Sequence, residues 1–561
     1  SRPVQKAEMR TFITRYRLEC SDQKVGNLCV PKKPIVYYVD PATPKWLVPW
    51  VKKAIEDWQP AFEAAGFSKG IIAKEAPSKA EDPDWSIEDA RYSVVDWLPS
   101  SIENAVGPHL ADPRSGEILS AHLQIYHNVM NLNRNWYWSQ VGALDPRARK
   151  LPFPDSLAGR LMEYVIAHET GHSIGFQHNM KASSLYPADS IHNRDFVRRM
   201  SHTPTLMDYS RFNYTAQPED NIALEDLIPK IGPYDIWATH WGYAPIPTAR
   251  TPDEERATLD AWAREQDSKP YLRFSTSGSL GTDPGENTEA VGDADAVKST
   301  GYGIKNIKRL VPMLIPATTN ATEDNSDLRE LYSALFNQWV TELRHVVVVV
   351  GSVESQEKYG SQPGPRFTPE SAARQKAAVK FLNENAFATP TFFLRPEILG
   401  RIEPNGALSR TTAAQSAILS TLLQDARINR LIEFEATAPA AGTVYSPTEF
   451  LADVRNGIWS ELNASSVKID AFRRALQSNY IDQINNKFTP PPFTPPAGLP
   501  AGFIISGPTR ANAAIRGLLR MELKALDAAV VAAAKKAADA ATRAHLENAH
   551  HDIDAILNPK S

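Results

Sequence analysis

One short segment of the chain holds three histidines and a glutamate at spacings that suit metal chemistry. Residues 168–178 read HETGHSIGFQH. On a helix, His168 and His172 are one turn apart and project from the same face, so both imidazoles can reach one ion. Gly175 lets the chain turn where the helix ends, which returns His178 as a third ligand. Three protein ligands leave one tetrahedral position open, as in catalytic zinc sites, and imidazoles favour Zn²⁺ over Mg²⁺ or Ca²⁺.

Glu169 stands beside the two helical histidines and is the candidate general base. A carboxylate at this position can take a proton from a zinc-bound water and then deliver it to the leaving amine. The segment therefore predicts a hydrolase. The alternative is a buried helix whose histidines are satisfied within the core.

The elements that must position this segment predict a mixed α/β unit. Strands are expected where β-branched and aromatic residues gather between turn residues, at 35–39, 70–73, 91–98 and 117–126. A helix is expected at 45–65, with a kink at Pro60. A second helix, at 157–174, carries His168 and His172.

Composition divides the chain into four expected parts. Residues 1–33 are polar and are expected to be a leader or the tail of a missing upstream domain. Residues 34–265 are expected to form the α/β unit that carries the three histidines. Residues 266–310 are expected to be an irregular connecting segment, in which 275–303 is rich in Gly, Ser, Asp and Thr. Residues 311–561 are mainly helical, with a Pro-rich linker near 489–500.

Charge and hydropathy exclude several classes of protein. The 561 residues carry a net charge of -4, with 42% hydrophobic and 22% charged residues, which is typical of a globular chain. This balance argues against a nucleic-acid partner, which requires a basic surface. No apolar run approaches the roughly 20 residues of a transmembrane helix, so a soluble chain is predicted. Cys20 and Cys29 form either one small disulfide or two free thiols.

Several motifs give the chain a family resemblance. HETGHSIGFQH matches the HExxHxxGxxH signature of the metzincin metallopeptidases, and TLMDY at 205–209 resembles their methionine turn, with Met207 beneath the zinc. The stretches PIVYYVD, DPRSGEIL, TLMDYSRFNYTAQPED and GYGIKNIKRL also resemble the large bacterial zinc-dependent metalloproteases that have a Met-zincin catalytic domain. The resemblance with distinctive motifs runs from Pro34 to Leu310.

The resemblance implies an α+β fold. It implies a metzincin-like catalytic domain with a twisted mixed sheet, a backing helix and an active-site helix, followed by a mainly α-helical C-terminal region. It also implies one catalytic Zn²⁺, a protein or peptide substrate, and an exported protein, either periplasmic or at the outer surface. Tyr209 stands where several metzincins place a tyrosine that approaches the zinc or the intermediate, unless it is only a packed aromatic residue. Asn179 departs from the acidic residue of adamalysins and astacins, so their specificities are not carried over.

The resemblance further implies that 117–126 is an antiparallel edge strand that pairs with the substrate backbone. The alternative is an ordinary internal strand. His122 and His127 are expected to be surface or cleft residues and not ligands. The substrate-binding residues would be Glu117, Ile118, Leu119, Ser120, Ala121 and His122.

Two further questions stay open at this point. An acidic cluster could bind Ca²⁺ or be a solvated loop; its members are Asp283, Glu286, Glu289, Asp293 and Asp295. The main prediction is a zinc-dependent endopeptidase of unknown oligomeric state. The alternatives are a catalytically silent zinc protein that acts as a binding module, and a zinc hydrolase of a non-peptide amide or ester.

Overall fold

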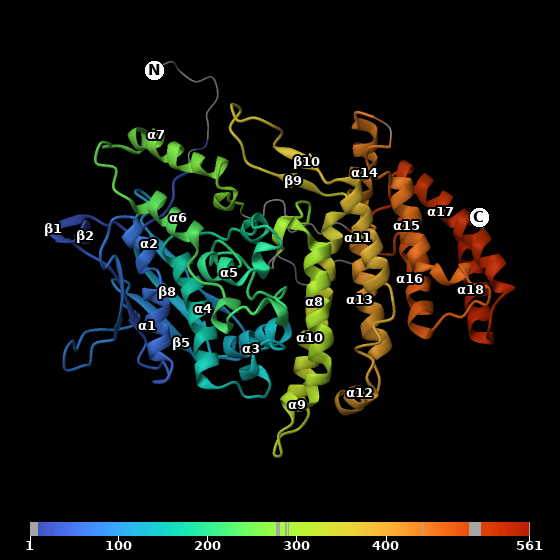
Figure 1. The fold of residues 1–561 in the computed structure, drawn as a ribbon, viewed down its shortest axis with the longest axis horizontal. Helices are drawn as coiled ribbons and strands as arrows, with labels where there is room; N and C mark the ends of the chain where they lie inside the picture. The colour runs from blue at the N-terminus through green and yellow to red at the C-terminus, as the bar shows by residue number, and fades with distance from the viewer. Residues whose placement is uncertain are drawn as a thin grey trace. The chain divides into compact units, whose positions relative to one another are not determined.

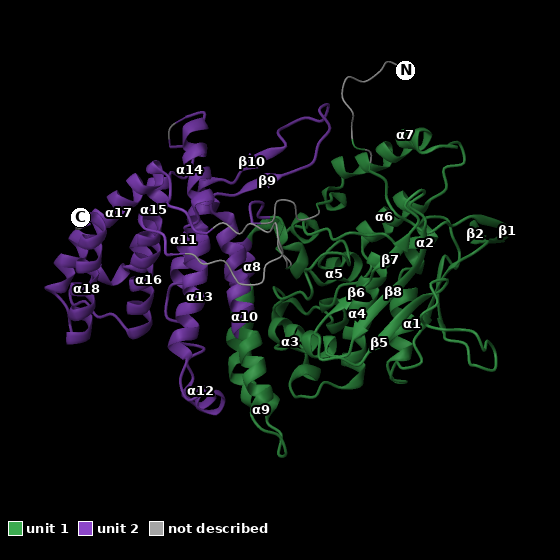
Figure 2. Cartoon of the chain, turned by 180° about the vertical axis from the view of Figure 1, so that it is seen from behind, with its two compact units in different colours: residues 1–280, 285–295, 302–335 green, residues 281–284, 296–301, 336–561 purple. Residues whose placement is uncertain are grey.

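The chain is described here from a computed structural model. The structure describes residues 9, 11–275, 281–286, 289, 291–440, 442–492 and 507–559. Two compact units divide the chain (Figure 2). The first unit comprises residues 1–280, 285–295 and 302–335, and the second comprises 281–284, 296–301 and 336–561. The domain limits that composition suggests stay predictions.

The first unit is built on a six-stranded mixed sheet. Its strands are β3 (Ile35–Val39), β4 (Ile71–Glu75), β5 (Ser93–Leu98), β6 (Ala105–Val106), β7 (His109–Ala111) and β8 (Ile118–Tyr126). The strand order is β4-β3-β5-β8-β6, and β7 also pairs with β8. Strands β3, β4, β5 and β8 run parallel to their neighbours among these four, whereas β6 and β7 are antiparallel to β8. The four strands expected from the sequence are therefore confirmed, as is the mixed sheet.

Strand β8 corrects one expectation about the substrate. It is paired on both sides, with β5 on one side and with β6 and β7 on the other. Near its start, the N–H of Ile118 also donates to the carbonyl of Arg15 at 2.8 Å. The prediction of an edge strand at 117–126 is wrong, because two very short strands already occupy its free side.

Helices α1 (Val48–Glu56) and α2 (Gln59–Ala64) replace the single helix expected at 45–65. Pro60 lies in the first turn of α2, where its missing N–H costs no helical hydrogen bond. The helix is therefore interrupted just before Pro60, where the sequence predicted only a kink. Helix α3 (Val129–Val141) was not predicted, whereas α4 (Asp155–Ser173) matches the helix expected at 157–174.

Helix α4 packs against α1 and β8, and the helices lie side by side beside the sheet (Figure 1). Nearly every residue of its second half is buried. Two hydrogen bonds fix that half: Trp58 Nε1–H donates to the carbonyl of Ala167 at 2.9 Å, and the hydroxyls of Tyr37 and Ser173 lie 2.6 Å apart. The end of α4 is thus held against both β3 and the turn before α2.

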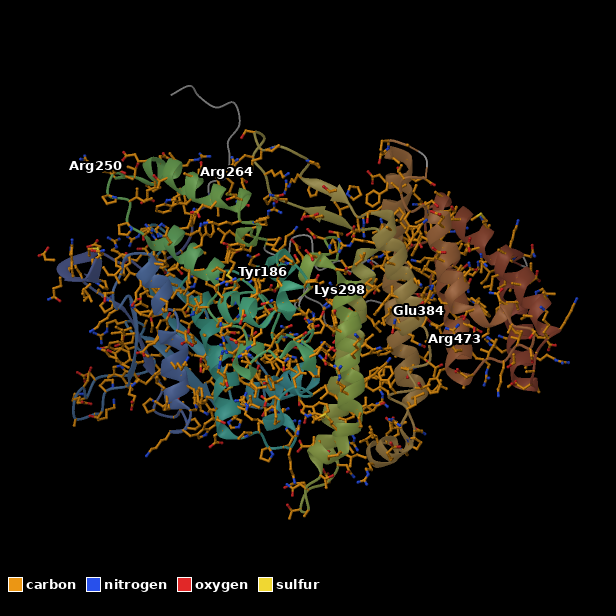
Figure 3. The ribbon with its side chains drawn as sticks, in the orientation of Figure 1. Tyr186, Arg250, Arg264, Lys298, Glu384 and Arg473 are labelled. Carbon is orange, nitrogen blue, oxygen red and sulfur yellow. A yellow bond between two sulfur atoms is a disulfide. The ribbon has the colours of Figure 1, made fainter. Side chains whose placement is uncertain are left out.

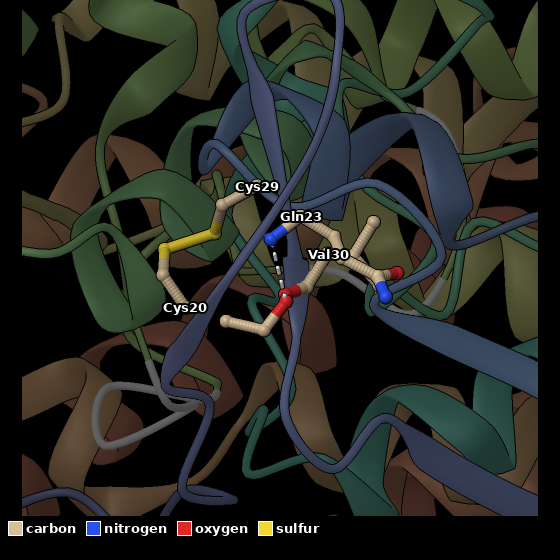
Figure 4. The surroundings of a disulfide bond; sticks show 5 residues. Cys20, Gln23, Cys29 and Val30 are labelled. Atoms are coloured by element: carbon tan, nitrogen blue, oxygen red, sulfur yellow. Dashed lines mark hydrogen bonds between the residues drawn. A yellow bond between two sulfur atoms is a disulfide. The ribbon is translucent and has the colours of Figure 1, made fainter.

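The segment before the sheet forms a hairpin of β1 (Cys20–Val25) and β2 (Leu28–Pro31). Cys20 and Cys29 are joined by a disulfide across this hairpin (Figure 4), which decides the question that the sequence left open. The hydroxyl of Ser21 donates to the carbonyl of Val30 at 2.7 Å in the same hairpin. Part of the leader expected at 1–33 is therefore ordered as a strand pair.

The remaining α-helices that lie wholly within the first unit follow α4 along the chain. They are α5 (Arg194–Met200), α6 (Pro233–Tyr243), α7 (Pro252–Ala263) and α9 (Leu314–Thr318). Helices α8 (Ala296–Leu310) and α10 (Ser326–Val349) have residues in both units. Helix α8 occupies the last part of 266–310, the segment that the sequence analysis expects to be irregular.

The second unit is mainly helical, as predicted. It holds β9 (Val353–Ser355), β10 (Phe367–Pro369), α11 (Ala372–Asn385), α12 (Pro396–Ile402), α13 (Ala407–Leu422), α14 (Asp425–Thr437), α15 (Pro447–Ile458), α16 (Ala471–Phe488), α17 (Ala513–Ala534) and α18 (Ala540–Leu557). Arg473 on α16, labelled in Figure 3, donates to Glu461 at 2.5 Å and to the carbonyl of Ile458 at 2.6 Å. Its charge is thereby compensated inside the helical core.

Most of the Pro-rich segment expected near 489–500 lies outside the described residues, which stop at 492 and resume at 507. Among the helices that the structure describes, none has the length and apolar character required to cross a bilayer. The α+β class, with a mixed sheet followed by a helical region, is confirmed.

Candidate metal centre

The last two turns of α4 present two of the three expected ligands. His168 and His172 stand four residues apart in α4, which ends at Ser173. Gly175 then adopts a φ of 106°, a conformation that side chains rarely permit, and a Cβ there would lie 2.4 Å from the carbonyl oxygen of Thr14. The turn at Gly175 brings His178 back beside the two helical ligands.

The three imidazoles meet through their Nε2 atoms. His178 Nε2 lies 3.2 Å from that of His168 and 3.0 Å from that of His172. Ligands at 2.0–2.1 Å from a tetrahedral zinc would be about 3.3 Å apart, so the spacing suits this ion. Among the described residues these histidines form the one group of three or more ligating side chains close enough to share a metal.

The outer nitrogens of the helical histidines fix the tautomers. His168 Nδ1 lies 2.7 Å from the carbonyl oxygen of Leu206, and His172 Nδ1 lies 2.9 Å from that of Phe176. A carbonyl oxygen can only accept, so each Nδ1 carries the hydrogen and each Nε2 carries a lone pair. Lone pairs that converge at this distance repel one another unless a cation lies between them, so the donor set fits zinc.

Burial keeps the ligands neutral. Burial, together with the neighbouring imidazoles, lowers the pKa of His168 to about 3 and that of His178 to about 4. Burial also lowers the pKa of His172. Neutral imidazole is the form that binds a metal.

Glu169 faces the same cavity as the ligands. Only 8% of the residue is exposed, and this burial raises the pKa of its carboxyl to about 7, against the lowering effect of a hydrogen bond from the backbone of Gly107. The carboxyl is therefore poised to exchange a proton near neutral pH in the metal-free protein.

Met207, the residue predicted for the methionine turn, is fully buried and lies next to Gly171 of α4. A Cβ on Gly171 would lie 2.3 Å from its sulfur, so this glycine leaves the room that the methionine fills. Asp235, at the start of α6, holds the turn: its carboxylate accepts from the backbone N–H of Leu206 at 2.8 Å and from the hydroxyl of Thr205 at 2.5 Å. The turn is thus built by residues far apart in the chain.

Tyr209 stands beside the ligands. Its ring centroid lies 4.3 Å from that of His178 and 5.9 Å from that of His168. Burial raises the pKa of its hydroxyl, as does the charge of Glu169. The side chain is half-buried and lines the cavity, and the raised pKa keeps its hydroxyl protonated and able to donate a hydrogen bond.

The cavity has a volume of about 470 Å³. Its walls are the segment around β6, one side of α3, the second half of α4, and the loop that follows the methionine turn. The lining residues are Asn104, Ala105, Val106, Gly107, Val129, Leu132, Trp136, Tyr164, Val165, His168, Glu169, His172, His178, Tyr209 and Arg211.

The residues expected to bind substrate lie elsewhere on the sheet. None of the six, from Glu117 to His122, lines the cavity. Ile118, Ser120 and Ala121 are buried, and Glu117 pairs with Arg17 at 2.8 Å. His127 packs edge-on against Trp97, with ring centroids 5.4 Å apart. Neither His122 nor His127 belongs to the metal centre.

The acidic segment does not form a second metal centre among the described residues. Asp283, Glu286 and Glu289 are buried, whereas Asp293 is exposed and Asp295 half-buried, so only part of the acidic cluster is solvated. Asp283 accepts from the backbone N–H of Ser355 at 2.8 Å, and Glu289 accepts from Gln140 at 2.9 Å. These carboxylates bind protein donors, and calcium is not shown.

Four residues of the site escaped the sequence analysis: Gly107, Trp136, Arg211 and Asp235. Asp235 follows the Gly-Pro pair that opens α6, a position where an acidic side chain caps a helix, so helix-start signals could have indicated it. No comparable pattern marks Gly107, Trp136 or Arg211, because only the tertiary fold brings them to the cavity.

Comparison with known families agrees with this geometry. A family model described as Met-zincin matches residues 150–466, more than half of the 561 residues. The matched range contains the three histidines, Glu169 and Met207, and it extends into the helical unit. No curated protein and no solved structure matches the chain.

Proposed function

The chain belongs to the Met-zincin family, and on that premise we propose that it is a zinc-dependent endopeptidase. One observation carries the proposal: three imidazole Nε2 atoms meet beside Glu169 on the wall of one cavity. A purely structural zinc site would enclose its ion with four protein ligands. Here three ligands face a cavity large enough for part of a peptide chain.

The residues around the cavity divide the reaction between them. A zinc ion held by His168, His172 and His178 would lower the pKa of a bound water and polarise the scissile carbonyl. The carboxylate of Glu169 accepts the proton of the attacking water and passes it to the nitrogen of the leaving amine. The hydroxyl of Tyr209 donates a hydrogen bond to the carbonyl oxygen as negative charge develops there.

We place the substrate backbone beside residues 104–107 rather than beside β8. This segment lines the cavity, and within the part of the chain that the structure describes its strand β6 pairs with β8 on one side only. A peptide in extended form can add to the other side through backbone hydrogen bonds, which bind many sequences with similar strength. The residues from Glu117 to His122 would then support the substrate-binding segment without touching the substrate.

We also propose that the protein acts outside the cytosol. The support is the disulfide between Cys20 and Cys29, because such bonds persist mainly in oxidising compartments.

The test is to measure zinc content and cleavage of a mixed peptide library for the parent protein and for Glu169→Gln. Glu63→Gln, an exposed change on α2, serves as the matched control. We expect about one zinc per chain in all three proteins, and cleavage by the parent and the control alone.

Two results would overturn the proposal. If all three proteins bind zinc and none cleaves a peptide, the centre belongs to a silent binding module or to a hydrolase of another amide or ester. If Glu169→Gln cleaves as fast as the parent, Glu169 is not the base.

A further inference from the structure

Arg211 forms part of the cavity wall, and its guanidinium is held against an aromatic ring. The guanidinium carbon lies 3.9 Å from the ring centroid of Trp136 and 5.8 Å from that of Tyr209. All three side chains line the cavity of the metal centre. Stacking on a ring restrains the guanidinium plane but leaves its edge N–H groups available as donors.

No carboxylate among the described residues pairs with Arg211. Two other partly buried arginines of the first unit have such partners: Arg147 pairs with Asp145 at 2.9 Å, and Arg160 with Glu163 at 3.4 Å. Arg309 instead donates to the side-chain amides of Gln217 and Asn306. A guanidinium withdrawn from water gains most from a carboxylate that accepts two of its hydrogens. At Arg211 the position of this carboxylate is open to a molecule bound in the cavity.

The backbone holds Arg211 in this position at a cost. Its φ is 45°, in the left-handed region that non-glycine residues seldom adopt. The next residue, Phe212, is fully buried, and its N–H donates to the side chain of Gln140 at 3.2 Å. Such backbone strain persists only where the surrounding structure holds the residue in place, and strained residues of this kind cluster at ligand-binding sites.

The charges that line the cavity favour an anion. Glu169 is its one carboxylate, and Arg211 its one side chain that is always cationic. A divalent metal on the three neutral histidines leaves an excess of positive charge. An anionic group on a substrate would be attracted, and the natural acceptor for it is the guanidinium.

We propose that Arg211 selects substrates that carry a carboxylate close to the scissile bond. This inference rests on the proposed peptidase function and adds a class of substrate to it. The carboxylate can come from an internal Asp or Glu side chain or from the C-terminus of a peptide. Both sources present the same planar pair of oxygens, so the experiment has to separate them.

In the first arm the peptides are blocked at both ends and are compared in pairs. The two peptides of a pair differ only in having Glu or Gln at one position near the cleavage site, and each such position is tested in turn. The second arm uses peptides without acidic side chains that end in a free carboxylate or an amide. Both arms compare the parent with Arg211→Gln, and Arg256→Gln, an exposed change on α7, is the control.

We expect the parent to cleave the favoured carboxylate peptide at least tenfold more efficiently in kcat/KM than its neutral partner. Arg211→Gln should remove this preference while it still cleaves the neutral peptide, and Arg256→Gln should keep the preference. Arg211→Glu should instead favour peptides with Lys at the same position, which keeps the test decisive if Arg211→Gln is poorly folded. Zinc content and thermal unfolding of every variant report on folding.

The outcomes separate this inference from the function on which it rests. If the parent cleaves nothing, the proposed function fails first. If the parent cleaves Glu and Gln peptides, and acid and amide peptides, equally well, the peptidase stands and the role of Arg211 is refuted. The role is also refuted if Arg211→Gln keeps the full preference.

Discussion

The Nδ1–H of His168 donates to the carbonyl oxygen of Leu206 over 2.7 Å, which joins a metal ligand to the turn that holds Met207. The peptide N–H of the same Leu206 donates to Asp235 at 2.8 Å. A carboxylate on α6 therefore sets the direction of the His168 ring without approaching the metal site itself. Outer partners of this kind orient metal ligands and tune their affinity.

Asp235→Ala should weaken zinc binding. The change leaves the N–H groups of Leu206 and Gly232 without their acceptor inside the protein, which should lower the free energy of unfolding by about 3 kcal/mol. With the turn less fixed, zinc affinity should fall by about 10- to 100-fold. Competition with a chelating dye measures the affinity, and urea unfolding measures the stability.

The matched control for this change is Asp195→Ala, at an exposed position on α5. It should leave both quantities nearly unchanged. Asp235→Asn should fall between the parent and the alanine variant, because an amide oxygen can still accept from one or two of the donors. Unchanged zinc affinity in Asp235→Ala would show that the turn does not position His168.

Gly171→Ala should destabilise the catalytic unit even though alanine favours helices. The new Cβ would lie 2.3 Å from the sulfur of Met207 and 2.8 Å from the ring of Trp58, so one of these side chains must move. Overpacking of this kind costs about 1–3 kcal/mol of unfolding free energy. Gly242→Ala, in α6, is the control, because its nearest atom would be 3.6 Å away. Without a clash this change should leave stability unchanged or raise it by up to about 1 kcal/mol.

Combining Gly171→Ala with Met207→Ala tests the contact directly. The shorter side chain removes the clash with sulfur, so the double variant should lose less stability than the two single changes added together. Strict additivity in urea unfolding would mean that Met207 is not what restricts position 171.

The chemistry of the centre could be predicted from the sequence because the residues that form it lie close together along the chain. His168, Glu169, His172 and His178 fall within one helical turn and one reversal, so spacing alone placed them together. Asp235 and Arg211 act on the same centre from separate segments. The local sequence pattern does not indicate contacts between distant segments, so only the tertiary structure identifies these two residues as part of the site.

Prediction of the sheet from the sequence is limited for a similar reason. β8 has the length and alternation of a strand, but which of its sides is free depends on β6 and β7, two strands of two and three residues. Runs this short leave no pattern. Helix α3 was missed for another reason: it buries Asn133, Asn135, Ser139 and Gln140 together with apolar and aromatic residues, so no purely apolar face marks it.

Removal of the disulfide should affect stability but not the metal centre. The bond between Cys20 and Cys29 closes a small loop, with a separation of 9 residues, in a hairpin that contributes nothing to the cavity wall. Cys20→Ala with Cys29→Ala should lower the free energy of unfolding by about 2–3 kcal/mol and leave zinc content at the parental value. The parent in reductant should match the variant, and loss of zinc in either would contradict this assignment.

Zinc affinity should depend only weakly on pH between 7.5 and 5.5. Protons compete with the metal for imidazole nitrogen, so affinity falls once the pH drops below the pKa of the free ligands. Three histidines with ordinary pKa values near 6.5 would together lose about a thousandfold in affinity over this interval. Here burial lowers the pKa of His168 to about 3 and that of His178 to about 4, so both stay neutral throughout.

What pH dependence remains should come from His172, whose pKa burial lowers from its ordinary value. The affinity of the folded protein should therefore fall by less than about tenfold, because one ligand at most gains a proton. A synthetic peptide of residues 168–178 is the control, since its histidines are exposed to water and should show the steep loss. If the protein loses affinity as steeply as the peptide, the metal-free site opens to water before it binds zinc, and the three ligands are not held together in advance.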